Sequence, residues 1–485
     1  MRTTEATAVL VGLSEQGHLI GGEFTARSSG GTFDHHEPAT GRHQATVAVG
    51  GADEVDSAVA CARAAQPAWA AASVEQRGAV LVRLAGLLEQ RARESAELAA
   101  IDNGTPVGVL NPGKYAARWL RYAAESALAL ESGEPATTGA SVVLEPYGVV
   151  GVVPPWNGSM MGMGQKCGAA LALGNTVVAK PPHVAPFGMV RFAELALEAG
   201  LPPGVLNVVV GGAEAGGALA GHPGVDKVTF TGGPATGRAI MAQAARRLTP
   251  VTLELGGKSP CLVFADADLD AVATMAARIG TALLSGQGCA LPTRIYVHSD
   301  VYSDVAERVQ DQLGSLAVGD PLDPATVVGP VVSETAMERI LGVIRRAQAD
   351  GATLLAGGQR LGGELAGGWF VAPTLFGDVD HHSALARNEV FGPVQALLRF
   401  DTDDEAIEKA NDSEYGLHAY LFTSDSDRIR RCTRELQAGT VVVNGMGRTS
   451  PAVPFGGVKH SGFGREGGRA GMMDMVRTKT VLTGP

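Results

Sequence analysis

Apolar residues recur every three or four positions over 53–100, and this spacing predicts helices. The pattern is carried first by Val55, Val59 and Ala62, and then by Val80, Leu84, Leu87 and Leu88. The segment 111–132 predicts a further helix, whose Trp119 and Tyr122 fit core packing better than a binding site. The first 50 residues are polar and rich in glycine, and they predict short strands and an arm. Their short apolar stretch, 6–13, is followed by no small-residue cleavage site and does not indicate a signal peptide.

Short β-rich runs alternate with helical segments over 142–257, which predicts βαβ units and a parallel sheet. The runs are 149–153, 176–179, 205–210 and 228–231, and the helices include 189–199 and 235–247. The region from about 261 to 443 repeats the alternation and predicts further parallel strands. Its runs are 295–298, 373–375, 394–400, 419–422 and 440–443, with helices at 301–313 and 334–349. A last strand is expected at 480–483.

With 485 residues, 45% of them apolar and 18% charged, the chain has a globular composition and room for about two to four domains. Glycine is unusually common, at 65 residues, which indicates tight turns or close approaches of the backbone to a ligand. The 39 basic residues are outnumbered by 50 acidic ones and form no long run, so nucleic acid is not an expected partner. No apolar run is long enough to predict a membrane span.

The cysteines are odd in number and widely spaced: Cys61, Cys167, Cys261, Cys289 and Cys432. Neither a disulfide framework nor a structural zinc site fits this spacing, and no metal is expected. The pattern favours a reducing compartment, the cytoplasm.

Cys289 has a distinctive setting, because the preceding residues 285–288 read Ser-Gly-Gln-Gly. Glycines beside a thiol allow a substrate to approach closely, whereas a lone cysteine is more often a small buried apolar residue. Taken alone, the motif leaves both interpretations open.

Two other polar residues follow β-rich runs. Glu254 lies between two leucines; buried there it would have a raised pKa and could act as a general base, or it could face solvent at a strand end. Asn157, in the loop Pro-Pro-Trp-Asn-Gly, could donate its amide to a developing oxyanion or cap a helix.

The segment 230–237, Phe-Thr-Gly-Gly-Pro-Ala-Thr-Gly, connects a strand to a helix. Such a turn can offer helix N-terminal amides to a pyrophosphate, but it is not the GxGxxG fingerprint and could be an ordinary connection. Lys180 follows another strand and could bind phosphate or ribose, or lie in solvent.

In this order the segments resemble the aldehyde dehydrogenase superfamily over about 37–481. The matching motifs are PWNGS at 155–159, KPP at 180–182, FTGG at 230–233, LELGGK at 253–258, GQGC at 286–289, EVFGP at 389–393, NDSEYGL at 411–417, GTVVVN at 439–444 and PFGGVKHSGFGRE at 454–466. Each motif is weak alone, but the ordered set is specific. The resemblance implies an α/β fold with a Rossmann-like dinucleotide-binding domain, an α/β catalytic domain and a small β oligomerisation arm.

The resemblance implies oxidation of an aldehyde to a carboxylic acid with hydride transfer to NAD(P). Cys289 would attack the carbonyl, and its backbone N–H and the amide of Asn157 would hold the oxyanion. Hydride transfer would leave a thioester, which water activated by Glu254 would hydrolyse. Lys166 and Glu466 match positions proposed to relay the proton taken up by Glu254.

The implied cofactor is NAD or NADP, with NAD favoured. Lys180 resembles the family's adenosine-ribose lysine, and Glu389 resembles the carboxylate that holds the nicotinamide ribose, with Phe391 beside it. The other implied contacts are Pro155, Trp156, His183, Gly212, Phe230, Gly232, Gly233, Gly237 and Leu255.

Two of these positions depart from the family pattern. Many NAD-preferring members carry glutamate where His183 stands; glutamate would bond the ribose 2′-hydroxyl and repel a 2′-phosphate, and histidine does neither strongly. If protonated, His183 would attract phosphate, so NADP use stays open. Many members carry serine where Gly233 stands, so a hydroxyl contact to pyrophosphate is lost while the backbone amide remains.

By position, the aldehyde tunnel would be lined by Gly158, Met161, Gly162, Gln165, Gly288, Ala290, Arg448 and Thr449. Several of these residues are small where many relatives carry aromatics, so a roomy tunnel for bulky or branched aldehydes is expected. Arg448 could instead recruit a carboxylate-bearing aldehyde, or remain in solvent.

The resemblance places the dinucleotide-binding domain at 1–130 and 148–258, the catalytic domain at 259–453, and the arm and tail at 131–147 and 454–485. Neither piece of the arm can satisfy its strand edges alone, so pairing with another copy, as a homodimer or homotetramer, is expected. The remaining expected partner is a small-molecule aldehyde.

Two other functions stay open. A CoA-acylating relative would end in thiol transfer, although a water-activating base at Glu254 would waste the thioester. A non-catalytic cofactor-binding protein would have no need of Cys289, Glu254 and Asn157 together.

Overall fold

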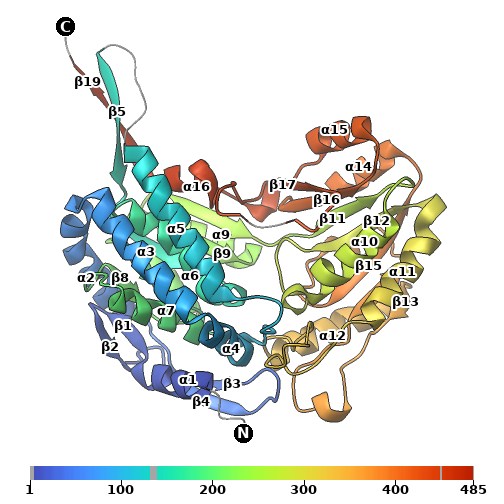
Figure 1. Ribbon diagram of the computed structural model, residues 1–485, viewed down its shortest axis with the longest axis horizontal. Coiled ribbons are helices and arrows are strands. Elements are labelled where there is room, and N and C mark those ends of the chain that lie inside the picture. Colours follow the sequence, from blue (N-terminus) through green and yellow to red (C-terminus); the bar gives the residue numbers. More distant parts are fainter. Residues whose placement is uncertain (1–4, 132–138, 448–449, 484–485) are drawn as a thin grey trace.

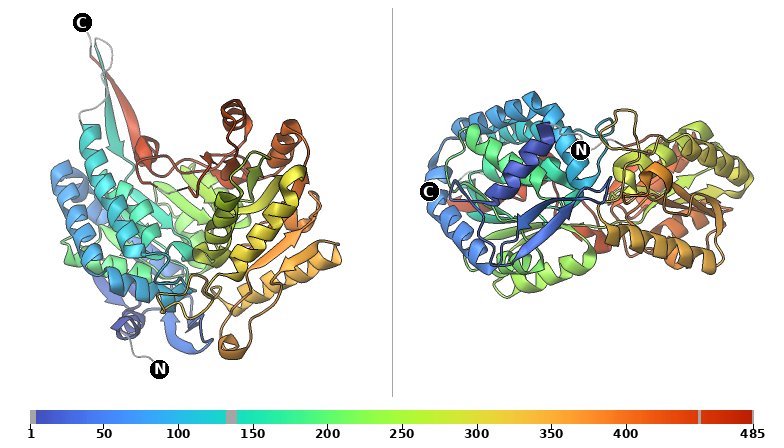
Figure 2. Two further views of the ribbon diagram at one scale, coloured as in Figure 1. Left: turned by 45° about the vertical axis from the view of Figure 1, so that its right-hand side comes forward. Right: turned by 90° about the horizontal axis from the view of Figure 1, so that it is seen from below.

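Two β-sheets, each packed against helices, form the centres of two lobes that lie side by side (Figures 1 and 2). The computed structural model describes residues 5–131, 139–447 and 450–483. Most strands in both sheets are parallel, which confirms the α/β fold class expected from the alternation of strands and helices.

The first sheet has the strand order β18-β10-β9-β6-β7-β8-β1-β2. Its strands are β1 (His18–Ile20), β2 (Glu23–Thr25), β6 (Val149–Val153), β7 (Thr176–Ala179), β8 (Leu206–Val208), β9 (Lys227–Gly232), β10 (Val251–Leu255) and β18 (Gly462–Phe463). The five central strands from β10 to β8 are parallel, whereas β18, β1 and β2 pair antiparallel at the edges.

The position of strand β6 in the sheet explains why its sequence is apolar throughout. Val150 and Val152 enter one hydrophobic core with α3 to α7, whereas Val149 and Val153 enter another with α2, α8 and α9. Because both faces of the strand are covered, the run shows no polar alternation. The surrounding helices are α2 (Ala52–Ala71), α3 (Val74–Gln90), α4 (Ala92–Asn103), α5 (Pro112–Glu131), α6 (Ser159–Ala172), α7 (Phe187–Glu198), α8 (Ala213–Gly221) and α9 (Pro234–Ala245).

The second sheet has the order β13-β14-β15-β12-β11-β16-β17, and of these strands β13 alone is antiparallel to its neighbour. The strands are β11 (Ser259–Val263), β12 (Pro292–His298), β13 (Thr353–Ala356), β14 (Thr374–Gly377), β15 (Val394–Phe400), β16 (His418–Phe422) and β17 (Thr440–Val443). The helices of this lobe are α10 (Leu269–Met275), α11 (Tyr302–Gly314), α12 (Glu334–Ala349), α13 (Ala384–Arg387), α14 (Asp403–Asn411) and α15 (Ser426–Glu435).

Two small antiparallel pairs complete the strands. Strands β3 (Thr32–His36) and β4 (His43–Ala48) pair with each other, and β5 (Ala140–Pro146) pairs with β19 (Val476–Leu482). The β5–β19 ribbon projects from the first lobe (Figure 1). Strand β19 begins at Val476, which is earlier than the strand expected at 480–483, and the helix α16 (Gly468–Met473) precedes it.

The short strands expected in the first 50 residues are present as β1 to β4, but helix α1 (Glu5–Gln16), which was not expected, precedes them. Ala6, Leu10 and Leu13 are buried on one face of this helix. The segment is too short and too uniformly apolar for its helical period to stand out in the sequence. Within the described part of the chain, no helix has the length and apolar character needed to cross a bilayer.

Candidate active site

Cys289 follows an irregular segment that connects α10 to β12. Ser285 in this segment has a φ of 53°, a backbone conformation that costs energy in a residue other than glycine. Its hydroxyl donates to the carbonyl of Gly329 and accepts from the amide of the same residue, both at 3.0 Å. The side-chain oxygen of Gln287 accepts from the amide of Val332 at 3.0 Å. These bonds fix the backbone just before the thiol.

The glycines around Cys289 allow chain segments to approach one another. A Cβ on Gly286 would lie 2.3 Å from the carbonyl carbon of Gly392, and a Cβ on Gly257 would lie 2.4 Å from the carbonyl oxygen of Cys289. A Cβ on Gly288 would lie 2.9 Å from Leu291. Close packing between backbone segments, rather than room for substrate alone, therefore accounts for these glycines.

Asn157 lies in a single 3₁₀ turn, Trp156–Gly158, between β6 and α6. Its Nδ2 donates to the carbonyl of Gln287 at 2.7 Å. It makes no capping hydrogen bond to this turn or to α6, so the helix-cap alternative is wrong. The loop is held from behind by Asn103, whose Nδ2 donates to the carbonyl of Trp156 at 3.2 Å.

Two cavities, of about 370 Å³ and about 180 Å³, meet at this point. Both are lined by Pro155, Asn157, Thr231 and Cys289. The thiol and the asparagine amide therefore face the junction of a larger and a smaller compartment.

The larger cavity contains most of the residues expected to contact a cofactor. It is lined by Pro155, Trp156, Lys180, Phe230, Gly232, Gly233, Leu255, Glu389 and Phe391, together with Val153, Pro154, Asn157, Pro182, Thr231, Thr236, Gly256 and Cys289. Three expected contacts, His183, Gly212 and Gly237, are not part of its lining. Gly237 packs instead against Leu255, where a Cβ would lie 2.7 Å from a side-chain methyl.

The larger cavity contains groups that suit a dinucleotide. Helix α9 begins directly after Gly233, and its first turn presents backbone amides toward an anion. No atom lies within 4 Å of a Cβ built on Gly233, so the space beside this amide is open. A Cβ on Gly256 would lie 2.2 Å from Oε2 of Glu389, so the backbone and this carboxylate lie in close contact in the same cavity. Gly232, Gly233 and Glu389 are thus the groups that would hold pyrophosphate and ribose.

Lys180 and His183 form the polar end of this region. The Nζ of Lys180 donates to the carbonyl of Gly211 at 3.1 Å, and burial lowers the pKa of this lysine to about 8. The His183 ring packs against Phe33, with centroids 4.5 Å apart. Burial, and then the charge of Lys180, lower the pKa of His183. The imidazole therefore takes up a proton less readily than an exposed histidine does.

The smaller cavity contains the described members of the expected aldehyde tunnel. Gly158, Met161, Gly162, Gln165, Gly288 and Ala290 all line it, whereas Arg448 and Thr449 lie outside the described residues. Its other lining residues include Leu110, Tyr115, Leu283, Leu284, Leu291 and Phe455, which the sequence did not single out. Phe455 lies in the motif 454–466, whereas the others lie outside the matched motifs, and all of them meet through tertiary packing.

Lys166 and Glu466 also line the smaller cavity, and they form a buried ion pair. The Nζ of Lys166 donates to Thr229 Oγ1 at 3.0 Å as well. Glu254 is 2% exposed, and its two carboxylate oxygens have no hydrogen-bond partner among the described residues. It lines neither cavity.

The electrostatics of Glu254 follow from this position. Burial, and then the negative charge of Glu466, raise its pKa well above the ordinary value, and Lys166 offsets part of that rise. This is the raised pKa expected for a buried carboxylate at this position. Burial, reinforced by Glu389 and Glu254, also raises the pKa of Cys289 to about 12. The resting thiol therefore keeps its proton, and attack on a carbonyl requires a base.

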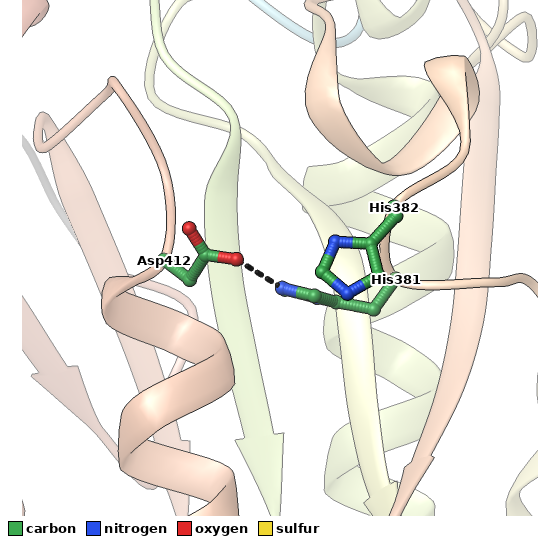
Figure 3. Close-up of side chains that lie close together, drawn as sticks. All are labelled: His381, His382 and Asp412. Atoms are coloured by element: carbon green, nitrogen blue, oxygen red, sulfur yellow. Dashed lines mark hydrogen bonds and ion pairs between the residues drawn. The ribbon is translucent and has the colours of Figure 1, made fainter.

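One cluster with metal-ligating residue types lies elsewhere, in the second lobe (Figure 3). Asp412 accepts from Nε2 of His381 at 2.8 Å and pairs with Arg387 at 2.7 Å, and His382 lies alongside. The other nitrogen of His381 is hydrogen-bonded to Tyr296 at 2.9 Å. Because a guanidinium already neutralises this carboxylate, we describe the cluster as an ion-pair network and assign no metal to it.

Cys289 lies at the junction of the two cavities, an arrangement that suits an enzyme with a reactive thiol beside a bound cofactor. The family is equally clear: the model of the aldehyde dehydrogenase family matches residues 24–481, and the chain belongs to this family. The chain is therefore an NAD(P)-dependent aldehyde dehydrogenase, as the sequence resemblance implied.

Solved structures of other proteins are similar to this chain over its whole fold. HpcC from Thermus thermophilus is 38% identical, with a TM-score of 0.94 over 98% of this chain and 95% of that chain. An aldehyde dehydrogenase from Bacillus cereus, solved with NAD+, is 36% identical, with a TM-score of 0.95 over 100% and 99% of the two chains. An NADP-dependent enzyme from E. coli is 35% identical, with a TM-score of 0.94 over 98% and 99%. The cofactor is accordingly NAD or NADP.

Proposed function

We propose that the protein oxidises a bulky or branched aldehyde to a carboxylic acid through a thioester on Cys289. The observation that carries this proposal is that Cys289 and Asn157 line both cavities at their junction. An aldehyde in the smaller cavity would meet the sulfur on one side and the larger cavity on the other. NAD or NADP, when bound in the larger cavity, supplies the hydride acceptor.

In the first half of the reaction, the sulfur of Cys289 bonds to the carbonyl carbon while the thiol proton passes to a base, which we assign as Glu254. The carbonyl oxygen becomes an oxyanion. Asn157 Nδ2 carries two hydrogens and uses one for Gln287, so the second is available to this oxygen. The backbone N–H of Cys289 is the second donor.

Loss of hydride from the same carbon leaves a thioester. Glu254 first gives up the thiol proton toward solvent. The regenerated carboxylate then takes a proton from water, the water oxygen bonds to the acyl carbon, and the carbon–sulfur bond breaks to release the acid and the Cys289 thiolate. Because Glu254 lines neither cavity, its carboxylate must turn toward the cavity or act through an intervening water. Lys166 and Glu466, which lie beside Glu254, are placed to pass the proton on.

The wall of the smaller cavity supports a bulky substrate. A Cβ on Gly158 or on Gly162 would make only ordinary contacts, at 3.6 Å or more, with Pro154 and Pro155. Side chains would therefore fit at both positions, and glycine leaves that volume to the substrate. The remaining wall includes a set of large apolar side chains, which favours an apolar aldehyde: Leu110, Met161, Leu283, Leu284, Leu291 and Phe455.

The β5–β19 ribbon supports assembly into a homodimer or homotetramer. Among the described residues its two strands pair only with each other, so both outer edges are open, and Leu482 is 76% and Val143 44% exposed. A second copy of the chain would cover these edges and apolar side chains. We retain the arm and tail boundaries 131–147 and 454–485, and the domains 1–130 with 148–258 and 259–453, as predictions.

The location we propose is the cytoplasm. All five cysteines are free thiols, as a reducing compartment would keep them.

The test is to follow the absorbance of reduced cofactor with NAD and NADP in parallel, over aldehydes of increasing bulk. We expect turnover with either cofactor and higher kcat/KM for branched or large aldehydes than for acetaldehyde. A preference for acetaldehyde would contradict the roomy tunnel. Formation of an acyl-CoA when CoA is added would favour the acylating relative, and no reduced cofactor with any aldehyde would favour a non-catalytic binding protein.

A further inference from the structure

The turn that carries Asn157 is only weakly fixed by its own backbone. The residues at its start, Pro154 and Pro155, have no N–H group to donate. The turn is closed by a hydrogen bond from the amide of Gly158 to the carbonyl of Pro155, which is long at 3.3 Å. The next residue, Ser159, has a φ of 43°, outside the helical region. Contacts from other segments are therefore needed to hold Asn157 in one place.

Asn103 supplies such a contact from the end of helix α4. It is buried, and its Nδ2 donates to the carbonyl of Trp156, the residue before Asn157, at 3.2 Å. Its Oδ1 accepts from the backbone amide of Thr105 at 3.2 Å and from the Thr105 hydroxyl at 2.8 Å. A backbone N–H can only donate, so the oxygen of the carboxamide must face Thr105 and the NH₂ group must face Trp156.

The same end of α4 packs against the second lobe (Figure 1). Gly104 has a φ of 83°, and a Cβ there would lie 2.9 Å from the ring of Pro330. A Cβ on Gly329 would lie 2.3 Å from the carbonyl oxygen of Gly104. The amide and carbonyl of Gly329 are both hydrogen-bonded to the Ser285 hydroxyl, at 3.0 Å. The end of α4 therefore contacts both the loop that carries the asparagine amide and the residues that hold the segment before the thiol.

We propose that Asn103 is a positioning residue, whose amide holds this loop so that the Asn157 donor stays aimed at the oxyanion. The inference rests on the proposed role of Asn157 as an oxyanion donor. Gln287 holds the side chain of Asn157, at 2.7 Å, whereas Asn103 holds the main chain beside it. Asn103 lines neither cavity, so it acts through the loop and not by contact with substrate or cofactor. A shift of about 1 Å at a reacting centre can lower a rate by about 10²-fold.

The test is Asn103→Ala, measured as the single-turnover rate of cofactor reduction, with enzyme in excess over aldehyde and the preferred cofactor saturating. We expect this rate to fall about tenfold or more, but by less than in Asn157→Ala, because the donor is displaced and not removed. In the Asn157→Ala background, the same substitution should change the rate less than about twofold, since no donor is left to displace. A general defect of the fold would lower the rate equally in both backgrounds.

Asn175→Ala is the matched control. Asn175 is a buried asparagine just beyond the far end of α6, and its Nδ2 donates to the carbonyls of Ala170 and Met475 at 3.1 and 3.0 Å. The two asparagines thus make the same kind of bond, from a buried carboxamide to main-chain carbonyls. The Asn175 variant should lose stability as the Asn103 variant does, and should keep the wild-type single-turnover rate.

Thr105→Val is a milder second variant that keeps the proposal testable if Asn103→Ala does not fold. It removes the hydroxyl that donates to Asn103 and keeps the size of the side chain. We expect the rate to fall about twofold or more, again only when Asn157 is present. Crystal structures follow the loop without turnover. The distance from Asn157 Nδ2 to the Gln287 carbonyl should exceed about 3.5 Å in Asn103→Ala and stay near 2.7 Å in Asn175→Ala.

A wild-type rate in Asn103→Ala would overturn the positioning role, and so would an equal fall in the two backgrounds. Weaker cofactor binding with an unchanged rate at saturation would also overturn it, because Asn103 would then act on the cofactor through Trp156, which lines the larger cavity. Failure of the proposed function gives a different result: Asn157→Ala itself would keep its rate. In that case the crystal structures alone decide whether Asn103 positions Asn157.

Discussion

Asn157 and Gln287 are joined by a hydrogen bond of 2.7 Å, from the side-chain amide of the asparagine to the main-chain carbonyl of the glutamine. The bond connects the loop after β6 to the segment that precedes Cys289. This contact between the two lobes therefore fixes the position of Asn157, the proposed oxyanion donor, relative to the thiol of Cys289.

Replacing Asn157 with alanine removes both this contact and one oxyanion donor. We expect kcat to fall about 10²- to 10³-fold, the usual effect of losing one such donor. Steady-state kinetics with a saturating aldehyde measure this loss, and circular dichroism checks that the fold is kept. A fall smaller than about tenfold would show that the oxyanion is held elsewhere.

Cys289→Ala is expected to abolish turnover and the burst of reduced cofactor, because no other thiol lines either cavity among the described residues. Cys61→Ala is the control, since Cys61 is a half-buried free thiol outside both cavities and should leave the rate unchanged. A normal burst in the Cys289 variant would refute the thioester.

Glu254→Gln keeps the size of the side chain and removes the base. The burst of reduced cofactor should persist in part, while the steady-state rate falls by about 10²-fold or more, because hydrolysis of the thioester becomes limiting. Rapid-mixing kinetics separate the two phases. Unchanged turnover would mean that another group activates water.

The raised pKa of Glu389 predicts that the stability of the cofactor-free protein depends on pH. Burial raises its pKa to about 7, whereas in the unfolded chain a glutamate ionises near about pH 4.3. Between about pH 4.5 and 7 the folded state holds a proton that the unfolded state has released, so this group's contribution to stability falls as pH rises.

Residue 389 cannot titrate in Glu389→Gln. Between pH 5 and pH 8, the free energy of unfolding of this variant, measured with urea, should therefore rise by up to about 3 kcal/mol relative to that of wild type. The exposed Glu364 supplies the control, since Glu364→Gln should track wild type at both pH values. If the free energies of unfolding of Glu389→Gln and wild type differ by a constant amount across this range, a group other than Glu389 titrates there.

Gly162→Leu should fill part of the smaller cavity, because a Cβ there meets only Pro154 and Pro155, at 3.7 Å. We expect kcat/KM for branched aldehydes to fall about tenfold or more while acetaldehyde is little affected. Equal losses for both substrates would argue that the glycine is needed for the fold.

The same helix shows how far the sequence could predict this site. Gly162 and Gly164 look alike in the sequence, yet a Cβ on Gly164 would lie 2.6 Å from the backbone of Ala116 in α5. One glycine borders the cavity and the other lets two helices approach. The role of each glycine depends on tertiary contacts, which the spacing of residues along the sequence does not show.

Elements with a strong local period were predicted well. Val80, Leu84 and Leu88 are buried along α3, and the apolar run 149–153 is the central strand β6. Short strands were expected in the first 50 residues, where the edge strands β1 and β2 lie, but helix α1 was not predicted, because this short segment takes its structure from the surface it covers.

The ordered motifs identified Cys289, Asn157 and most of the cofactor cavity. They did not reveal the wall formed by Leu110, Leu283 and Leu284, or that Glu254 lines neither cavity. These features depend on how distant segments pack in three dimensions.

Strand β18 pairs antiparallel with β10 directly at Glu254, and Glu466 lies just beyond β18. Synthesis of the chain reaches this strand only after every strand of the second sheet has been made. During translation, the β10 edge of the first sheet therefore stays unpaired until the second lobe has emerged from the ribosome. A nascent chain that already contains Lys166, Glu254 and Cys289 still lacks Glu466, so the Lys166–Glu466 ion pair can form only after both lobes have been synthesised.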